Sequence, residues 1–128
     1  MRIFKNAWFA QFARKQRIAD KALVDAVHRA ERGLIDANLG GGVVKQRIAR
    51  SGQGKSSGYR VIILYLRNER AFFVYGFAKS DRDNIDNEEA THFKAMARHV
   101  LALSDQHLSE AVARGIFVEI RDDEELQK

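Results

Sequence analysis

Hydrophobic positions at the start of the chain recur at helical spacing. Phe4, Trp8 and Phe12 lie four residues apart, which predicts a short first helix with an aromatic stripe facing the core. A second helix is predicted over residues 20–37, because its apolar positions keep a period near 3.6 while charged residues fill the other side. Asp20 is the expected N-cap, and the glycine cluster that follows is expected to end this helix.

The period of the pattern changes after the second helix. Residues 44–48, 59–66 and 71–78 are rich in β-branched and aromatic side chains and predict three strands. A glycine–serine loop over residues 50–58 joins the first pair, and the polar residues 67–70 form a short turn between the second pair. Since consecutive strands usually lie side by side, we expect an antiparallel meander.

Two more helices are predicted in the last third of the chain. Asp86 and Glu89 have the spacing of a capping box and precede an apolar helical stripe, which we expect to pack across the sheet. Ser104 or Asp105 can cap the next short helix.

The last element is expected to be a short strand at the sheet edge, with Ile116, Val118 and Ile120 alternating with Phe117 and Glu119. The predicted fold is therefore α+β, with two N-terminal helices, an antiparallel sheet of three to four strands and C-terminal helices packed on the sheet.

Size and composition indicate one soluble domain. The chain has 128 residues, of which 45% are apolar and 30% charged, and we expect residues 1–121 to form the domain and residues 122–128 an acidic, solvated tail. The absence of cysteine excludes disulfides, thiolate zinc sites and thiol nucleophiles, and is typical of the cytoplasm. No apolar run is long enough to span a bilayer, so neither export nor a membrane is expected.

The charge pattern points to a polyanionic partner. Residues 43–60 contain five basic side chains and no acid: Lys45, Arg47, Arg50, Lys55 and Arg60. Unopposed positive charge of this kind is typical of a surface that binds RNA or DNA phosphate, although a solvated hairpin connection has the same composition. Tyr59, Tyr65 and Tyr75 lie on the surrounding strands, and we expect one of them to stack on an unpaired base.

Three other motifs in the sequence lack a feature that their chemistry requires. Residues 49–56 fit a loose phosphate-binding loop, but a strand rather than a helix is predicted to follow, so no helix N-terminus faces the anion. Residues 81–86 lack the glycine that a calcium loop requires. His92 and His99 share a helix without a third ligand and are expected to be surface residues. We therefore expect no metal and no cofactor.

Three segments together resemble the RelE/ParE superfamily of toxins, most closely its HigB-type, RelE-like branch. They are Lys-Gln-Arg-Ile at 45–48, Gly-Lys-Ser-Ser-Gly-Tyr-Arg-Val-Ile at 54–62 and Phe-Val-Tyr-Gly-Phe-Ala-Lys at 73–79. The resemblance covers about residues 39–103, and the ending of the chain looks like phage-derived members. It implies an endoribonuclease that enters the ribosome and cuts messenger RNA, and a cognate antitoxin, expected to be a helix-turn-helix protein.

The resemblance also implies roles for individual residues. Arg60 matches the arginine that stabilises the pentavalent phosphate. Lys45 and Arg47 match basic strand positions, either of which orients the phosphate, and a lysine crowded by like charges can act as base. Lys79 and Arg82 match the basic residues that close the third hairpin, as candidates for protonating the leaving group or for contacting the RNA backbone. RNA contacts are expected from Arg50, Lys55, Tyr59, Tyr65, Tyr75 and Arg82.

The sequence also departs from the pattern of this family. The late aromatic of RelE has no counterpart, and the histidine–aspartate pair of some HigB enzymes is not evident. A ParE-like inhibitor of DNA gyrase and a non-catalytic, phage-derived nucleic-acid-binding module therefore stay open as alternatives.

Overall fold

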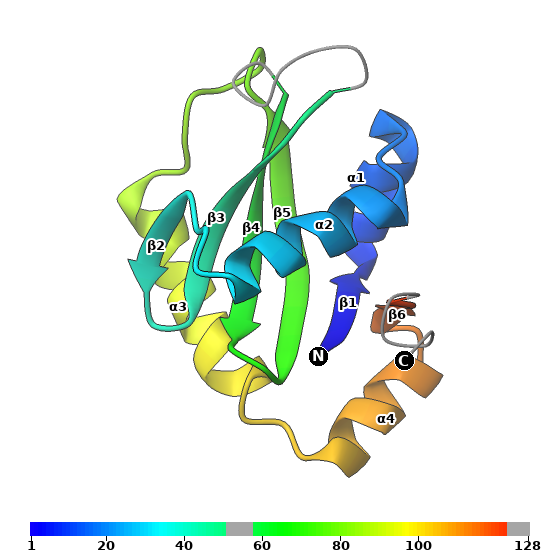
Figure 1. Ribbon diagram of the computed structural model, residues 1–128. Helices are drawn as coiled ribbons and strands as arrows, with labels where there is room; N and C mark the ends of the chain where they lie inside the picture. The colour runs from blue at the N-terminus through cyan, green and yellow to red at the C-terminus, as the bar shows by residue number, and fades with distance from the viewer. Residues whose placement is uncertain (51–57, 123–128) are drawn as a thin grey trace.

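The computed structural model describes residues 1–50 and 58–122, which form four helices and one six-stranded sheet (Figure 1). The strands are β1 (Arg2–Asn6), β2 (Ala37–Gly40), β3 (Val43–Ile48), β4 (Tyr59–Leu66), β5 (Arg70–Ala78) and β6 (Phe117–Ile120). The helices are α1 (Ala7–Gln16), α2 (Asp20–Glu31), α3 (Asn87–Val100) and α4 (Asp105–Ala113). The α+β class is confirmed.

The sheet is larger than predicted and it is mixed. Its strand order is β2-β3-β4-β5-β1-β6. The predicted antiparallel neighbours β3, β4 and β5 are confirmed, but β1 pairs parallel to β5 and antiparallel to β6. The two predicted N-terminal helices are confirmed, although β1 precedes them, but the prediction of an antiparallel sheet of three to four strands is wrong.

The first predicted helix begins later than its aromatic spacing indicated. Phe4 lies on β1 and stacks on Phe72 with ring centroids 4.8 Å apart, whereas Trp8 on α1 is 46% exposed. Asn6 ends the strand and starts α1, because its side-chain oxygen accepts a hydrogen bond from the Phe9 N–H at 2.8 Å. The four-residue spacing of Phe4 and Trp8 thus joins two elements and does not mark one helical face.

The second helix is shorter than predicted. Gly33 has a φ of 82°, its N–H donates to the Ala30 carbonyl, and the Leu34 N–H donates to the Arg29 carbonyl, which is a Schellman motif that ends α2. Leu34 is consequently exposed, and residues 37–40 form the edge strand β2. Asp20 is the first helical residue and not the N-cap, and its carboxylate pairs with Lys5 at 3.0 Å.

The predictions for the C-terminal third are mostly confirmed. Asp86 and Glu89 form the capping box of α3, and Ser104 caps α4. β6 is an edge strand, as expected. Its buried residues are Phe117 and Ile120, however, while Ile116 and Val118 are exposed, so the predicted alternation is wrong in its detail.

Two apolar cores lie on opposite faces of the sheet. α1 and α2 cover one face with residues such as Phe9 and Leu23, while α3 and α4 cover the other with Phe93 and Leu108. Figure 1 shows α2 crossing in front of the central strands and α3 behind them. Gly76 allows α1 to lie directly on β5, since a Cβ there would come within 2.7 Å of the Phe12 ring.

The domain extends one residue into the predicted tail. Asp122 is buried, and its carboxylate lies 2.7 Å from Nε2 of His28 on α2. Asp122 was expected to be solvated as the first residue of the tail, but it is buried and paired with the folded domain. The rest of the predicted tail, residues 123–128, lies outside the described residues. None of the helices in the described part of the chain has the length and apolar character that a bilayer span requires.

Candidate functional site

Strand β3 presents two basic side chains on the face that it shares with α3. Val44, Gln46 and Ile48 are buried toward α2, so that the alternating residues Lys45 and Arg47 point to the opposite face. Gln46 fixes this orientation, because its amide donates to the Ala26 and Leu34 carbonyls and accepts from the Asp36 N–H at 2.7 Å. The sequence alternation of β3 therefore decides where its positive charge lies.

Strand β4 adds Arg60 to the same face. Arg47 and Arg60 are directly paired across β3 and β4, and paired residues project to the same side of a sheet. Farther along β4, Ile62 and Leu64 pack in the core beneath α3. Arg60 is only 8% exposed, so its guanidinium has little contact with water.

Lys79 completes the group directly after β5. Its backbone N–H donates to the Gly58 carbonyl at 2.9 Å, which ties it to the start of β4, and its Nζ lies 3.1 Å from Asp83 Oδ1. We call Lys45, Arg47, Arg60 and Lys79 the cationic cluster. These four residues are the ones that the family resemblance assigned to catalysis, and they lie together.

The electrostatics of Lys45 reflect this crowding. Its pKa is lowered, first by burial of the ammonium and then by the positive charges of Arg60, Lys79 and Arg47. Asp36 opposes this effect. A lysine in such surroundings releases its proton more readily than an ordinary surface lysine, which suits it to accept a proton from a substrate.

The loop between β5 and α3 borders the cluster. Arg82 donates to both carboxylate oxygens of Glu89, at 2.7 and 3.1 Å, and to the Tyr75 hydroxyl at 3.0 Å. These hydrogen bonds raise the pKa of Arg82 and, together with a backbone hydrogen bond from Asp86, lower that of Glu89. The Arg82 guanidinium also lies over the Phe77 ring at 5.4 Å. Arg82 is thus a bridge between loop, strand and helix at the edge of the cationic cluster.

Tyr75 lies on the cluster's face of the sheet but is packed among other rings. Its ring centroid is 4.7 Å from that of Trp8 and 5.7 Å from that of Phe93. Of the three tyrosines predicted to contact RNA, it is the one on the same face as Lys45, because both residues pair with Ile62 across neighbouring strands.

Three other predicted RNA contacts, Arg50, Tyr59 and Tyr65, lie on the opposite face. Tyr59 is 4% exposed and its hydroxyl donates to Gln16 on α1, while Arg50 lies over the Tyr59 ring at 5.1 Å. Tyr65 donates to Glu31 on α2, and burial followed by this hydrogen bond raises its pKa. Tyr59 and Tyr65 therefore do not share a face with the cationic cluster. Lys55 lies outside the described residues.

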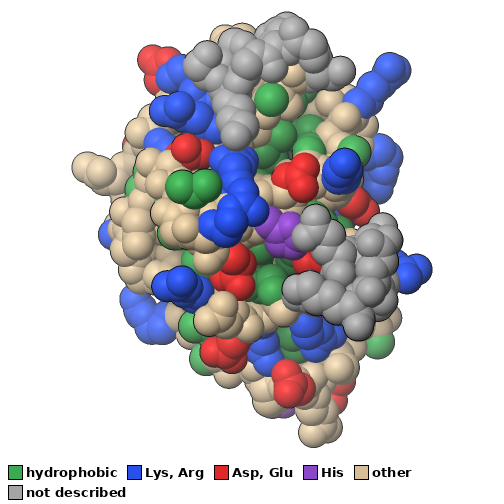
Figure 2. Space-filling model, in the orientation of Figure 1, with side chains coloured by type: hydrophobic (Ala, Val, Ile, Leu, Met, Phe, Trp, Pro, Cys, Tyr) green, Lys and Arg blue, Asp and Glu red, His purple; other side chains and the backbone are tan. Residues whose placement is uncertain are grey.

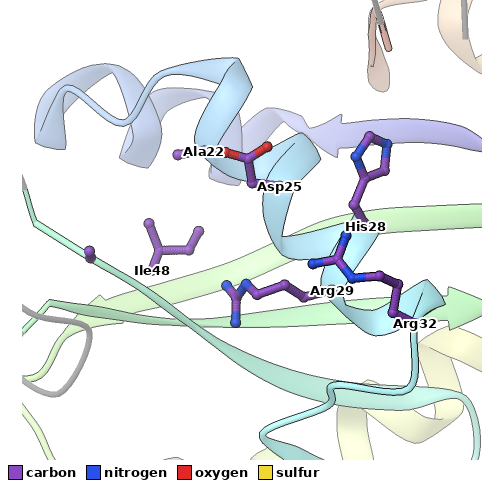
Figure 3. A pocket seen from close by; sticks show the side chains of 7 residues that line it. Ala22, Asp25, His28, Arg29, Arg32 and Ile48 are labelled. Carbon is purple, nitrogen blue, oxygen red and sulfur yellow. The ribbon is translucent and has the colours of Figure 1, made fainter. Parts of the chain in front are cut away.

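The surface crossed by α2 carries mixed charge. Lys and Arg side chains gather there beside a histidine (Figure 2), and Figure 3 shows Asp25, His28, Arg29 and Arg32 projecting from α2 around a hollow that Ile48 borders. Arg29 is engaged by the Arg47 carbonyl at 2.6 Å and by Asp36 at 3.6 Å. Within residues 1–50 and 58–122, no group of His, Cys, Asp and Glu side chains has the arrangement of a metal site.

Sequence reasoning missed Asn84, which lies in the loop between β5 and α3. Its side-chain oxygen accepts a hydrogen bond from Lys45 Nζ at 2.8 Å. In the sequence it is one polar residue in an acidic turn, 39 positions from Lys45, and no local pattern distinguishes it.

Comparison with known proteins identifies the family. The family described as the RelE toxin of the RelE/RelB toxin–antitoxin system matches residues 1–120, which is nearly the whole chain. No curated protein matches the sequence. Because the match includes every described strand and helix, the chain belongs to the RelE toxin family.

Proposed function

We propose that this toxin is a ribosome-dependent endoribonuclease that cuts messenger RNA. The observation that carries the proposal is the cationic cluster, in which Lys45 is partly buried among Arg47, Arg60 and Lys79 on one face of the sheet. A cluster of this kind binds a phosphate and neutralises the charge that develops when the phosphate is attacked. Translated messenger RNA as substrate makes the cytoplasm the expected site of action.

The reaction that suits these residues is attack of a ribose 2′-hydroxyl on the neighbouring phosphate. The hydroxyl loses its proton to a basic side chain, its oxygen bonds to phosphorus, and the bond from phosphorus to the 5′-oxygen breaks as that oxygen takes up a proton. Arg60 is assigned to the pentavalent phosphate because it is the cluster's most buried guanidinium, and Arg47 is assigned to orienting the phosphate.

Membership in a toxin–antitoxin family implies an antitoxin partner. We propose that this partner is a helix-turn-helix protein that covers the cationic cluster with an acidic or amphipathic segment. Such a segment replaces the RNA phosphate with carboxylates and keeps the cluster inactive while the two proteins are bound.

The experiment is cleavage of a messenger RNA in a reconstituted translation reaction, with and without ribosomes. The parent is expected to cut only translated RNA, and Arg60→Ala is expected to lose about 10²- to 10³-fold in rate, the usual effect of removing one transition-state donor. Arg60→Lys keeps the charge and separates loss of the guanidinium from loss of positive charge. Arg50→Ala, on the opposite face, is the matched control and is expected to cut normally.

An intact parent protein that neither arrests growth nor cuts translated RNA would sink this proposal. Inhibition of DNA supercoiling by gyrase would favour the ParE-like alternative instead. Salt-sensitive RNA binding without cleavage would favour the non-catalytic module.

A further inference from the structure

The two lysines of the cationic cluster have chemically different partners. Lys45 Nζ donates to the amide oxygen of Asn84 at 2.8 Å, while Lys79 Nζ lies 3.1 Å from the carboxylate of Asp83. Both partners come from the loop between β5 and α3 and are adjacent in sequence. One lysine is therefore held by a neutral acceptor and the other by an anion.

This difference matters because a neighbouring anion stabilises an ammonium whereas an amide adds no charge. Burial and the positive charges of Arg60, Lys79 and Arg47 all lower the pKa of Lys45, whereas the Asp36 carboxylate acts in the opposite direction. A carboxylate in place of the Asn84 amide would cancel much of this effect at hydrogen-bond distance.

Asn84 is itself held in place by its loop. Its side-chain oxygen also accepts from the Ile85 N–H at 2.9 Å, and its carbonyl accepts from Arg82 Nε at 3.0 Å. Arg82 is in turn bound by Glu89 in the first turn of α3. The amide oxygen that meets Lys45 is thus positioned by both the loop and the helix.

We propose that Asn84 is a positioning residue that holds Lys45 in the cationic cluster without adding negative charge, which makes Lys45 the general base and leaves Lys79 as the proton donor. The inference rests on the proposed RNA cleavage and assigns its proton transfers. An N–H of the neutral Lys45 amine donates to Asn84, which leaves the nitrogen lone pair for the substrate. That lone pair takes the 2′-hydroxyl proton, and the Lys79 ammonium gives a proton to the departing 5′-oxygen.

The first test measures Lys45 directly and needs no catalysis. Asn84→Asp has nearly the same shape and still accepts from the Ile85 N–H, but it places a charge beside Lys45. The Lys45 pKa, followed by ¹³C NMR of the lysine side chains and assigned with Lys45→Arg, is expected to rise by about one unit or more. The control Asp83→Asn removes the carboxylate beside Lys79 and is expected not to raise the Lys45 pKa.

The second test is the pH dependence of RNA cleavage. In Asn84→Asp the ascending limb of the rate profile is expected to move to higher pH by the same amount, with about a tenfold loss at neutral pH that higher pH restores. Asn84→Ala removes the hydrogen bond without adding charge, and is expected to slow cleavage at every pH without moving the limb upward.

The outcomes separate the two proposals. An unchanged Lys45 titration in a folded Asn84→Asp protein overturns the role of Asn84, whether or not the parent cuts RNA. A shifted titration with an unmoved limb overturns Lys45 as the base. A parent that does not cut RNA overturns the proposed function and leaves the titration result standing. If Asn84→Asp does not fold, normal cleavage by Asn84→Ala overturns the positioning role.

Discussion

The residues on the two faces of β4 differ in their role, although they alternate along one strand. Tyr59 points toward α1, where its hydroxyl bonds to Gln16 and its ring lies in the apolar core. Arg60, the next residue, points to the other face and contributes to the positive surroundings of Lys45. Neighbouring residues of one strand therefore belong to different parts of the molecule, one to its stability and the other to its proposed chemistry.

The cationic cluster lowers the stability of the fold, in contrast to the residues around Tyr59. Burying Lys45 beside three like charges is unfavourable, which its lowered pKa reflects, whereas every contact of Tyr59 supports packing or hydrogen bonding. Residues that oppose folding and yet lie together on one surface are typical of functional sites. The contacts of Tyr59 are those of a residue that stabilises the fold.

The largest effect that separates the faces is expected from Lys45→Met. This change keeps the length of the side chain and removes its charge and proton, so cleavage is expected to fall by about 10²- to 10⁴-fold, the usual contribution of a general base. The unfolding midpoint in urea is expected to stay the same or to rise, because a crowded cation has been removed. A large loss of stability would show that Lys45 belongs to the fold.

The pH dependence of stability tests whether the folded chain holds Lys45 in unfavourable surroundings. Because the pKa of Lys45 is lower in the folded chain than in the unfolded one, the unfolded state binds more protons between the two values, and stability rises with pH there. This rise is expected to be absent in Lys45→Met. Urea unfolding at several pH values up to about 10.5, the ordinary lysine value, measures it.

A smaller effect is expected from Tyr59→Phe, which should lower stability and leave RNA cleavage unchanged. Loss of the buried hydroxyl and its bonds to Gln16 is expected to lower the free energy of unfolding by about 1 to 2 kcal/mol. RNA cleavage under conditions where the protein stays folded is expected to be unchanged. A selective loss of cleavage in Tyr59→Phe would mean that RNA reaches both faces.

The smallest effect is expected in the salt dependence of RNA binding. Arg47→Ala removes one proposed phosphate contact from the cationic cluster, so the slope of log affinity against log salt is expected to decrease by about one. Arg50→Ala removes an equal charge from the other face and is expected to leave the slope unchanged. Equal decreases in the two variants would contradict a binding surface restricted to one face.

Much of the candidate site was predictable from the sequence. The basic run over residues 43–60 is a local pattern and contained Lys45, Arg47 and Arg60, while Lys79 and the grouping of the four residues came from the family resemblance. The sequence also contained a signal that went unused. Tyr59 and Arg60 are adjacent in a predicted strand and must face opposite sides, so they were not suited to one groove. Asn84 had no such signal, because its contact with Lys45 depends on the path of a loop.

The sequence by itself determined the elements whose stability is local. These are the strands β3 to β5, the caps at Asp86 and Ser104 and the short final strand. The tertiary structure decided the rest. Residues 2–6 became a strand because they pair with β5, nearly seventy positions away, and β6 joined the sheet by pairing with β1. The convergence of the cations and the contact of Lys45 with the Asn84 amide depend on such distant pairings, which local propensity does not encode.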